Sequence, residues 1–184
     1  QRYPSADKSL PARYARSISM FRKGDTKNAI PIIDSLIRDI PENPYFWELK
    51  GQALLEGGAP AKALASLRQA NKLLPNSGLI QILYAQALIA TEDRANIKQA
   101  LNLLTLAKKT ERDSVDVYKY SALAYGYLND LPRAELATAE MAMMQGDTAL
   151  ASEKAKRVIG QFKHGSPEWM KANDVLNFTS KERN

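Results

Sequence analysis

Few side chains in this sequence have the types and spacing that catalysis requires. The chain has one histidine, His164, and no cysteine, so it does not offer the three or more ligands that a zinc site needs. We interpret His164, which precedes the last predicted helix, as a solvated turn residue. Glu92 with Asp93 and Glu111 with Asp113 stand at predicted helix ends, where carboxylates stabilise helix N-termini. We therefore expect no catalytic residue, no bound metal and no cofactor in this chain.

Phosphate and nucleic-acid chemistry is not indicated either. No predicted strand precedes the glycines, so none of them forms a phosphate-binding loop. The chain is basic, with a net charge of +6 and a pI of about 9.4. Its basic cluster of Lys154, Lys156 and Arg157 nevertheless lacks interleaved aromatic side chains that would stack on bases. We interpret this cluster as an ordinary solvated helix face and expect no nucleic-acid partner.

Aromatic and amide side chains favour a different chemistry, the binding of a polypeptide. Aromatic rings provide contact area at a low cost in entropy, and a solvated surface would be richer in charge. The predicted partner-binding residues are Tyr14, Phe21, Tyr45, Glu48, Gln52, Gln86, Lys119, Tyr120 and Tyr127. Beside them we expect Ile18, Leu55, Ile82 and Ile89. The alternative is that several of these side chains belong to the core or are covered by the C-terminal helices.

Four recurring alanines indicate which elements carry these side chains. Ala29, Ala63, Ala100 and Ala134 follow one another at nearly regular intervals, of which the middle one is slightly longer, and each comes after a turn signal. The other two intervals match the roughly 34 residues of a tetratricopeptide (TPR) unit, two antiparallel helices that cross closely at small residues. We predict an all-α, right-handed TPR solenoid of about ten antiparallel helices with a C-terminal capping helix. The first helix of each unit would carry the binding face.

The repeat divides the chain into segments. The second unit fits the TPR pattern best, because Trp47 and Gly51 stand at the expected distances before Ala63. In the third unit we place three extra residues around 93–96, in the turn between its two helices, with the packing faces still in register. The predicted segments are a linker at 1–9, a TPR array at 10–163 with units at about 10–43, 44–77, 78–114 and 115–146, and a capping helix and tail at 164–184.

The C-terminal part departs from the regular period. Ala151 follows Ala134 after only half a repeat. We therefore predict that the helix of about 131–145 closes the fourth unit and also opens a fifth hairpin, which extends to residue 163. Ser166, Pro167 and Glu168 then predict the N-cap and first turn of a last helix that covers the final apolar face.

Membrane insertion is not predicted. No apolar run reaches the roughly 18 residues of a membrane span, and the longest candidate, at 79–90, is interrupted by Gln81 and Gln86. The sequence begins at Gln1 without a signal-like segment. We expect the chain to be a piece of a longer protein.

Several runs of residues are more specific than the alanine period. They lie at 3–9, 12–18, 124–126, 146–147 and 165–169, and the most distinctive is Asn43-Pro44-Tyr45-Phe46-Trp47-Glu48-Leu49-Lys50-Gly51-Gln52. Together they resemble the C-terminal TPR region of bacterial HExxH zinc metallopeptidases, the BepA-like periplasmic group. The resemblance covers nearly the whole chain.

The resemblance implies a non-catalytic TPR domain of a larger periplasmic zinc metalloprotease. Zinc would belong to a protease domain that this chain lacks, and no residue of a His-Glu-x-x-His motif is present to be transferred. The implied partners are substrates, envelope-assembly proteins and the protease domain itself, and the implied role is quality control of envelope proteins. The alternative is an independent TPR scaffold or chaperone for secretion or envelope assembly.

Overall fold

The fold consists of helices stacked in chain order. The computed structural model describes residue 4 and residues 6–181, and in this part of the chain it contains ten α-helices, one short 3-10 helix and no strand. The all-α prediction is confirmed. The helices are α1 (Leu10–Arg22), α2 (Thr26–Asp39), α3 (Pro44–Glu56), α4 (Pro60–Leu73), α5 (Gly78–Ile89), α6 (Arg94–Ala107), α7 (Val115–Tyr127), α8 (Leu131–Met144), α9 (Thr148–Val158) and α10 (Pro167–Lys181), with the 3-10 helix at Ile159–Gln161.

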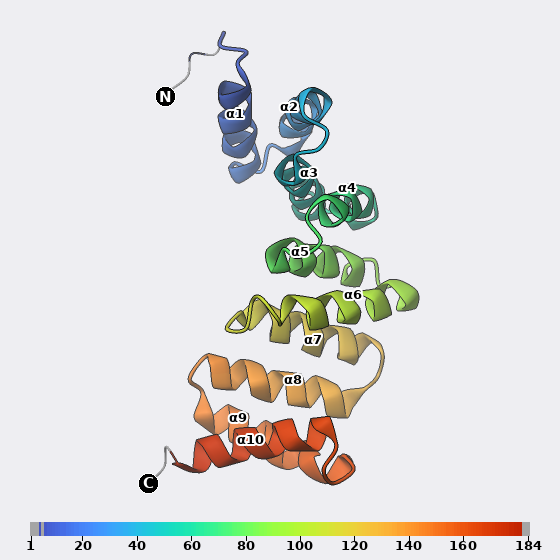
Figure 1. Ribbon diagram of the computed structural model, residues 1–184, viewed down its shortest axis with the longest axis vertical. Coiled ribbons are helices and arrows are strands. Elements are labelled where there is room, and N and C mark those ends of the chain that lie inside the picture. Colours follow the sequence, from blue (N-terminus) through green and yellow to red (C-terminus); the bar gives the residue numbers. More distant parts are fainter. Residues whose placement is uncertain (1–3, 5, 182–184) are drawn as a thin grey trace.

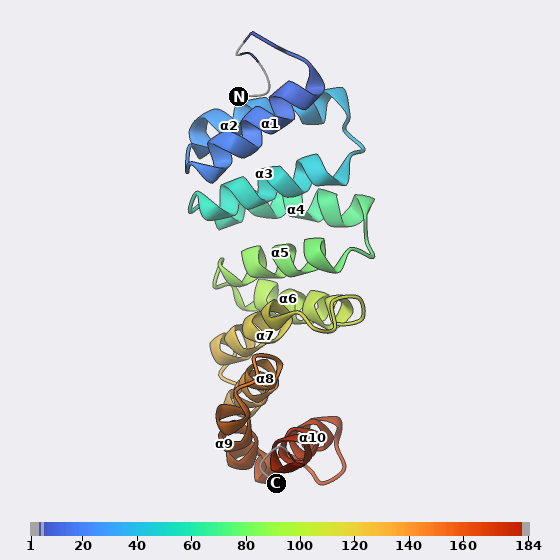
Figure 2. The same ribbon diagram turned by 90° about the vertical axis from the view of Figure 1, so that its left-hand side faces the viewer.

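Helices that follow one another in the sequence lie side by side and run antiparallel. The stack extends along the longest axis of the molecule, with α1 at one end and α10 at the other (Figures 1 and 2). Each helix packs mainly against its neighbours in the chain, and contacts between α3 and α5 and between α5 and α7 join successive hairpins. In Figure 1, α1 lies to the left of α2 and α3 to the left of α4, so the first helices of these hairpins share one side.

The turns between paired helices repeat one design. Gly24, Gly58 and Gly146 have positive φ angles of 76°, 75° and 78°, a conformation that favours glycine, and they end the preceding helix. A capping residue then follows in most turns. For example, the carboxylate of Asp147 accepts a hydrogen bond from the Leu150 N–H at 3.0 Å. The glycine and acid pairs of the sequence therefore fix where the helices begin and end.

Small residues allow the paired helices to cross closely. Gly51 of α3 lies against the fully buried Leu67 of α4, and a Cβ atom at Gly51 would overlap the Leu67 side chain. Ala29 and Ala63 are completely buried in the second helices of their hairpins. A larger side chain at these positions would push the helices apart, which explains the residue types that the repeat retains.

The third hairpin differs from the prediction. Residues 94–96 form the first turn of α6 rather than a longer loop, and the Asp93 carboxylate caps that turn by accepting hydrogen bonds from the backbone N–H groups of Ala95 and Asn96 at 2.9 and 2.8 Å. The extra residues lie instead in the connection 108–114 between α6 and α7. Ala100 still faces the core, but Ile97, also buried, is the residue that lies as far from its N-cap as Ala63 does.

The C-terminal helices close the stack. Helix α8 packs against both α7 and α9, and α10 packs across α9 and α8. Ser166 caps α10, because its Oγ accepts a hydrogen bond from the Trp169 N–H at 3.2 Å, and Pro167 is the first residue of the helix. The capping helix is therefore confirmed. Parts of the predicted linker at 1–9 and of the tail at 164–184 fall outside the described residues.

Candidate functional site

Helices α1 and α3 together form an open groove, which we call the N-terminal groove. Its volume is about 300 Å³. The groove brings together five of the nine predicted partner-binding residues. Its lining consists of Tyr14, Ile18, Phe21, Arg22, Tyr45, Glu48, Leu49 and Gln52.

Aromatic rings form the walls of the N-terminal groove. Tyr14 is 36% exposed and Tyr45 is 55% exposed, which is high for such large side chains. The ring of Tyr14 also packs against the buried ring of Phe46, with centroids 5.7 Å apart. Phe21 is half-buried and packs against the core residues of α2 and α3. Tyr14 and Phe21 are therefore held in place by packing on one side, while Tyr14 and Tyr45 leave much of their surface exposed. Exposed aromatic rings of this kind are enriched at protein interfaces.

Polar side chains on α3 lie between these walls. Glu48 is half-buried, and this burial raises the pKa of its carboxyl group. Within residues 6–181 no basic nitrogen lies within 4 Å of the Glu48 carboxylate. One turn later, Gln52 Nε2 donates a hydrogen bond to Glu56 Oε1 at 2.9 Å. Arg22 is an exposed residue at the end of α1.

The other four predicted residues lie on α5 and α7, outside the N-terminal groove. Gln86 is half-buried and Lys119 is exposed, with its Nζ 5.2 Å from the centre of the half-buried Tyr120 ring. Tyr127 is 45% exposed, and its hydroxyl donates a hydrogen bond to Glu92 Oε1 at 3.1 Å. A role for these residues in binding stays a prediction.

Two of the apolar residues expected beside the predicted partner-binding residues are not on the surface. Ile82 and Ile89 were expected on the binding face but are buried in the central core. Helix α5 contacts α3, α4, α6 and α7, so little of its surface remains free. A repeat alignment identifies the position of a residue on its helix, but it does not show how closely the neighbouring helices cover that position.

Three exposed side chains were missed. Arg22 lines the N-terminal groove, and the leucines Leu79 of α5 and Leu123 of α7 are 63% and 47% exposed. The repeat period contained the signal for both leucines. Leu79 follows Tyr45 by one full repeat, and Leu123 follows Lys119 by one helical turn, as Gln52 follows Glu48.

A second cavity lies near the C-terminal end. It has a volume of about 130 Å³ and is lined by residues of α6, α7, α8 and α10. Four of its charged groups form two ion pairs: Arg133 contacts Glu168 at 2.9 Å, and Lys108 contacts Glu140 at 2.8 Å. Burial also raises the pKa of the Tyr125 hydroxyl in this cavity. We interpret these ion pairs as links that hold α10 and α6 against α8.

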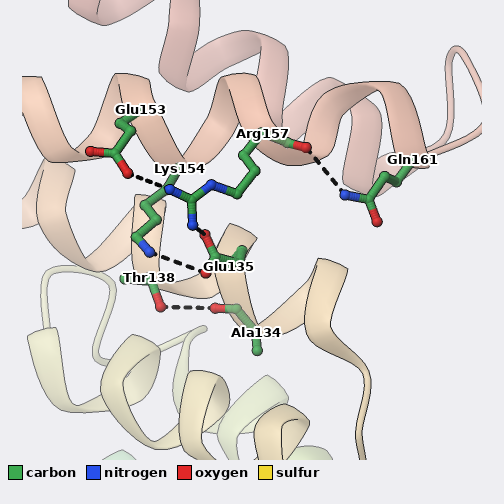
Figure 3. A network of polar contacts seen from close by, with 7 residues as sticks. All are labelled: Ala134, Glu135, Thr138, Glu153, Lys154, Arg157 and Gln161. Atoms are coloured by element: carbon green, nitrogen blue, oxygen red, sulfur yellow. Dashed lines mark hydrogen bonds and ion pairs between the residues drawn. The ribbon is translucent and has the colours of Figure 1, made fainter.

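The basic residues of α9 are largely engaged in contacts within the protein. Lys154 and Arg157 reach Glu135 of α8 at 3.1 and 3.4 Å, and Arg157 also reaches Glu153 at 2.6 Å (Figure 3). These pairs neutralise two of the three cations in the cluster at 154–157. The network therefore connects α8 with α9 and does not resemble a free basic surface that would follow a phosphate backbone.

His164, the predicted turn histidine, lies next to an aromatic side chain. His164 is exposed, and its ring lies 4.2 Å from the Trp169 ring, centroid to centroid. Within the described part of the chain, no three histidine, cysteine or acidic residues converge as a metal site would require. The helices described there are also too short or too polar for one of them to span a bilayer.

Comparison with known proteins decides the family. A family model described as the cytochrome c-type biogenesis protein H TPR domain matches residues 33–149, well over half of the sequence. The chain belongs to this family. The TPR architecture predicted from the alanine period is therefore confirmed, and the chain is a TPR protein-interaction domain. No curated protein matches the sequence.

Solved structures share the fold of this TPR domain. The MamA RS-1 ArsTM double mutant is 15% identical, with a TM-score of 0.70 over 98% of this chain and 99% of that one. MamA 41-end from Desulfovibrio magneticus RS-1 is 16% identical, with a TM-score of 0.70 over 97% and 98% of the two chains. A thermophilic TPR protein from Thermus thermophilus is 16% identical, with a TM-score of 0.58 over 92% and 100%. At these identities the similarity shows the fold alone.

The resemblance to HExxH metallopeptidases is wrong. The matched region contains the run 43–52 on which the resemblance mainly rested, and it belongs to a different TPR family. Structure explains why this run misleads. The Asn43 side chain accepts a hydrogen bond from the Tyr45 N–H at 3.0 Å, Trp47 Nε1 donates to the Pro41 carbonyl at 2.7 Å, and Gly51 allows the close crossing with Leu67. Asn43, Trp47 and Gly51 thus have structural roles within the TPR hairpins, and these roles require no protease domain.

Proposed function

We propose that this TPR domain acts as a scaffold in the biogenesis of c-type cytochromes and binds an extended polypeptide segment in its N-terminal groove. Membership of the cytochrome c-type biogenesis protein H TPR family supports a role in this process. The observation that supports the groove is the convergence of exposed Tyr14 and Tyr45, from two successive hairpins, on either side of one open channel. TPR arrays offer such concave faces for polypeptide binding.

The chemistry of the groove suits a polypeptide better than a small molecule. The groove is open to solvent, and its lining combines aromatic rings with the carboxylate of Glu48 and the amide of Gln52. Rings supply apolar contact area, while carboxylate and amide groups can pair with peptide N–H groups or polar side chains. A partner of this kind contributes many weak contacts rather than one tightly enclosed group.

We propose that the partner is a cytochrome polypeptide before haem attachment. A chain that depends on haem to complete its core exposes extended apolar segments until the haem is attached. Such segments match an open groove, whereas the folded cytochrome hides them. A periplasmic location, first suggested by the metallopeptidase resemblance, stays a prediction.

Binding to haem-free and folded cytochrome c tests the proposal. We expect the haem-free polypeptide to bind, and the folded holoprotein to bind at least about tenfold more weakly, in isothermal titration calorimetry. A Tyr14→Ala and Tyr45→Ala double variant should weaken binding of the haem-free polypeptide by more than about tenfold, because each ring is a candidate anchor. Phe178→Ala is the matched control, since Phe178 is 47% exposed on α10 at the far end of the stack. Equal affinities of the double variant and the control would contradict the proposal.

A further inference from the structure

Glu48 occupies an unusual place in the N-terminal groove. It lies on α3 one turn after Tyr45 and one turn before Gln52, and all three side chains line the same channel. Lys50, two residues further along, points away from it and pairs with Asp34 of α2 at 2.7 Å. The carboxylate of Glu48 is half-buried and has no basic partner within 4 Å in the described chain.

A half-buried carboxylate without a counter-charge is costly for the free protein. It has lost part of its hydration, and no ion pair replaces the lost interactions, which is why burial raises the pKa of Glu48. The rings of Tyr14, Phe21 and Tyr45 surround the same space. Aromatic faces attract ammonium and guanidinium groups, and a carboxylate pairs with them directly. Both features therefore suit a cation.

We infer that the N-terminal groove selects polypeptide segments that carry a lysine or arginine side chain, and that Glu48 is the residue that determines this specificity. The inference rests on the proposed function, because it concerns the same groove. Arg22 lies at the groove edge, where it suits an acidic group of the segment rather than the selected cation. The net charge of +6 disfavours basic partners at long range, so a preference for lysine must come from local contacts.

Matched synthetic peptides test this inference without a cytochrome. The probes are three fluorescein-labelled peptides of equal length that are identical except at one central position, which is lysine, norleucine or glutamate, between two phenylalanines. We expect the lysine peptide to bind about tenfold more tightly than the norleucine peptide in fluorescence anisotropy, and the glutamate peptide to bind most weakly. In Glu48→Gln the difference between lysine and norleucine should disappear. Glu42→Gln, at an exposed loop residue, changes the net charge equally and should leave the difference intact.

The outcomes separate this inference from the proposed function. Equal affinities of the lysine and norleucine peptides for the unmodified protein, a preference that persists in Glu48→Gln, or no binding of any peptide would each overturn the assignment of Glu48. A lysine preference that depends on Glu48, together with no binding of haem-free cytochrome c, would support the selectivity of the groove and overturn the proposed cytochrome partner. Circular dichroism of each variant verifies that the helices remain folded.

Discussion

The effect of replacing a helical glycine in this fold depends on which atoms lie next to its Cα. Gly51 is enclosed by the Leu67 side chain, whereas Gly126 in α7 has no heavy atom within 4 Å of the position where a Cβ would stand. We expect Gly51→Ala to lower the free energy of unfolding by about 1–3 kcal/mol, because Leu67 is fully buried and cannot move aside. Urea denaturation measures this difference.

Gly126→Ala provides the control for that experiment. Alanine restricts the unfolded chain and favours helix, so this substitution should raise the free energy of unfolding by about 0.5 kcal/mol. A loss of stability in Gly126→Ala, or no loss in Gly51→Ala, would show that the two sites do not differ in packing as described.

Glu48 should also make stability depend on pH. Its pKa is raised in the folded state, so the folded protein binds more protons than the unfolded one between the unfolded and folded pKa values, and stability falls as pH rises through that window. We expect Glu48→Gln to be more stable than the unmodified protein at pH 7 and to lose this advantage below the unfolded pKa of about 4.3. Thermal unfolding at pH 3.5 and pH 7 measures the effect, and an advantage that is equal at both pH values would contradict it.

At the scale of residues, the repeat period predicted the small side chains at the helix crossings. It did not predict which residue takes the crossing position in the third hairpin. Ala29, Ala63 and Gly51 follow from the spacing of the repeat, because close helix crossings exclude larger side chains. The third hairpin could not be read in the same way. Ile97 occupies the place of the repeated alanine there, and Ala100 lies one turn later on the same buried face, so the spacing of alanines suggested an insertion in the wrong connection.

Ion pairs should contribute to the contact between elements α8 and α9. Glu135 is the acceptor for both Lys154 and Arg157, and its side chain is 28% exposed. We expect Glu135→Gln to lower the free energy of unfolding by about 1 kcal/mol, since it weakens two partly exposed pairs at once. Glu153→Gln is the control, because Glu153 pairs only within α9 and is 58% exposed. Chemical denaturation should show the difference at low salt and less of it at about 1 M NaCl, and a salt-independent difference would argue against an electrostatic origin.

At the scale of elements, the residues in the turns made the helix ends predictable. The sequence did not predict which helix surfaces are covered by other helices. Glycines with positive φ and acidic or serine caps mark helix ends locally, so sequence alone indicates them. The accessibility of α5 depends on four other helices, and no local pattern reports it. The N-terminal groove was predictable only in part. The repeat places Tyr14 and Tyr45 on one face, whereas the position of Arg22 in the groove depends on how α1 meets α3.

At the scale of the whole molecule, stability should vary along the stack. The largest core cluster spans α4 to α7, and each helix depends mainly on its neighbours. We expect native-state hydrogen exchange to be slowest in α5 and α6 and faster in α1 and α10, which have neighbours on only one side of the stack. Equal protection in all helices would indicate that the domain unfolds as one cooperative unit.

Helix α8 has a consequence for how this architecture can be altered. Helix α8 packs as extensively against α9 as against α7, whereas α2 with α3, α4 with α5 and α6 with α7 pack less extensively than paired helices do. Helix α8 therefore serves as half of two hairpins at once, while α10 rests on α8 and α9. An engineer could therefore exchange α1–α2 or α3–α4 as hairpins, provided that the core contacts between α2 and α3 are kept. The segment α8–α10 would have to be transplanted as an indivisible block, since removing any one of its helices leaves another with an uncovered face.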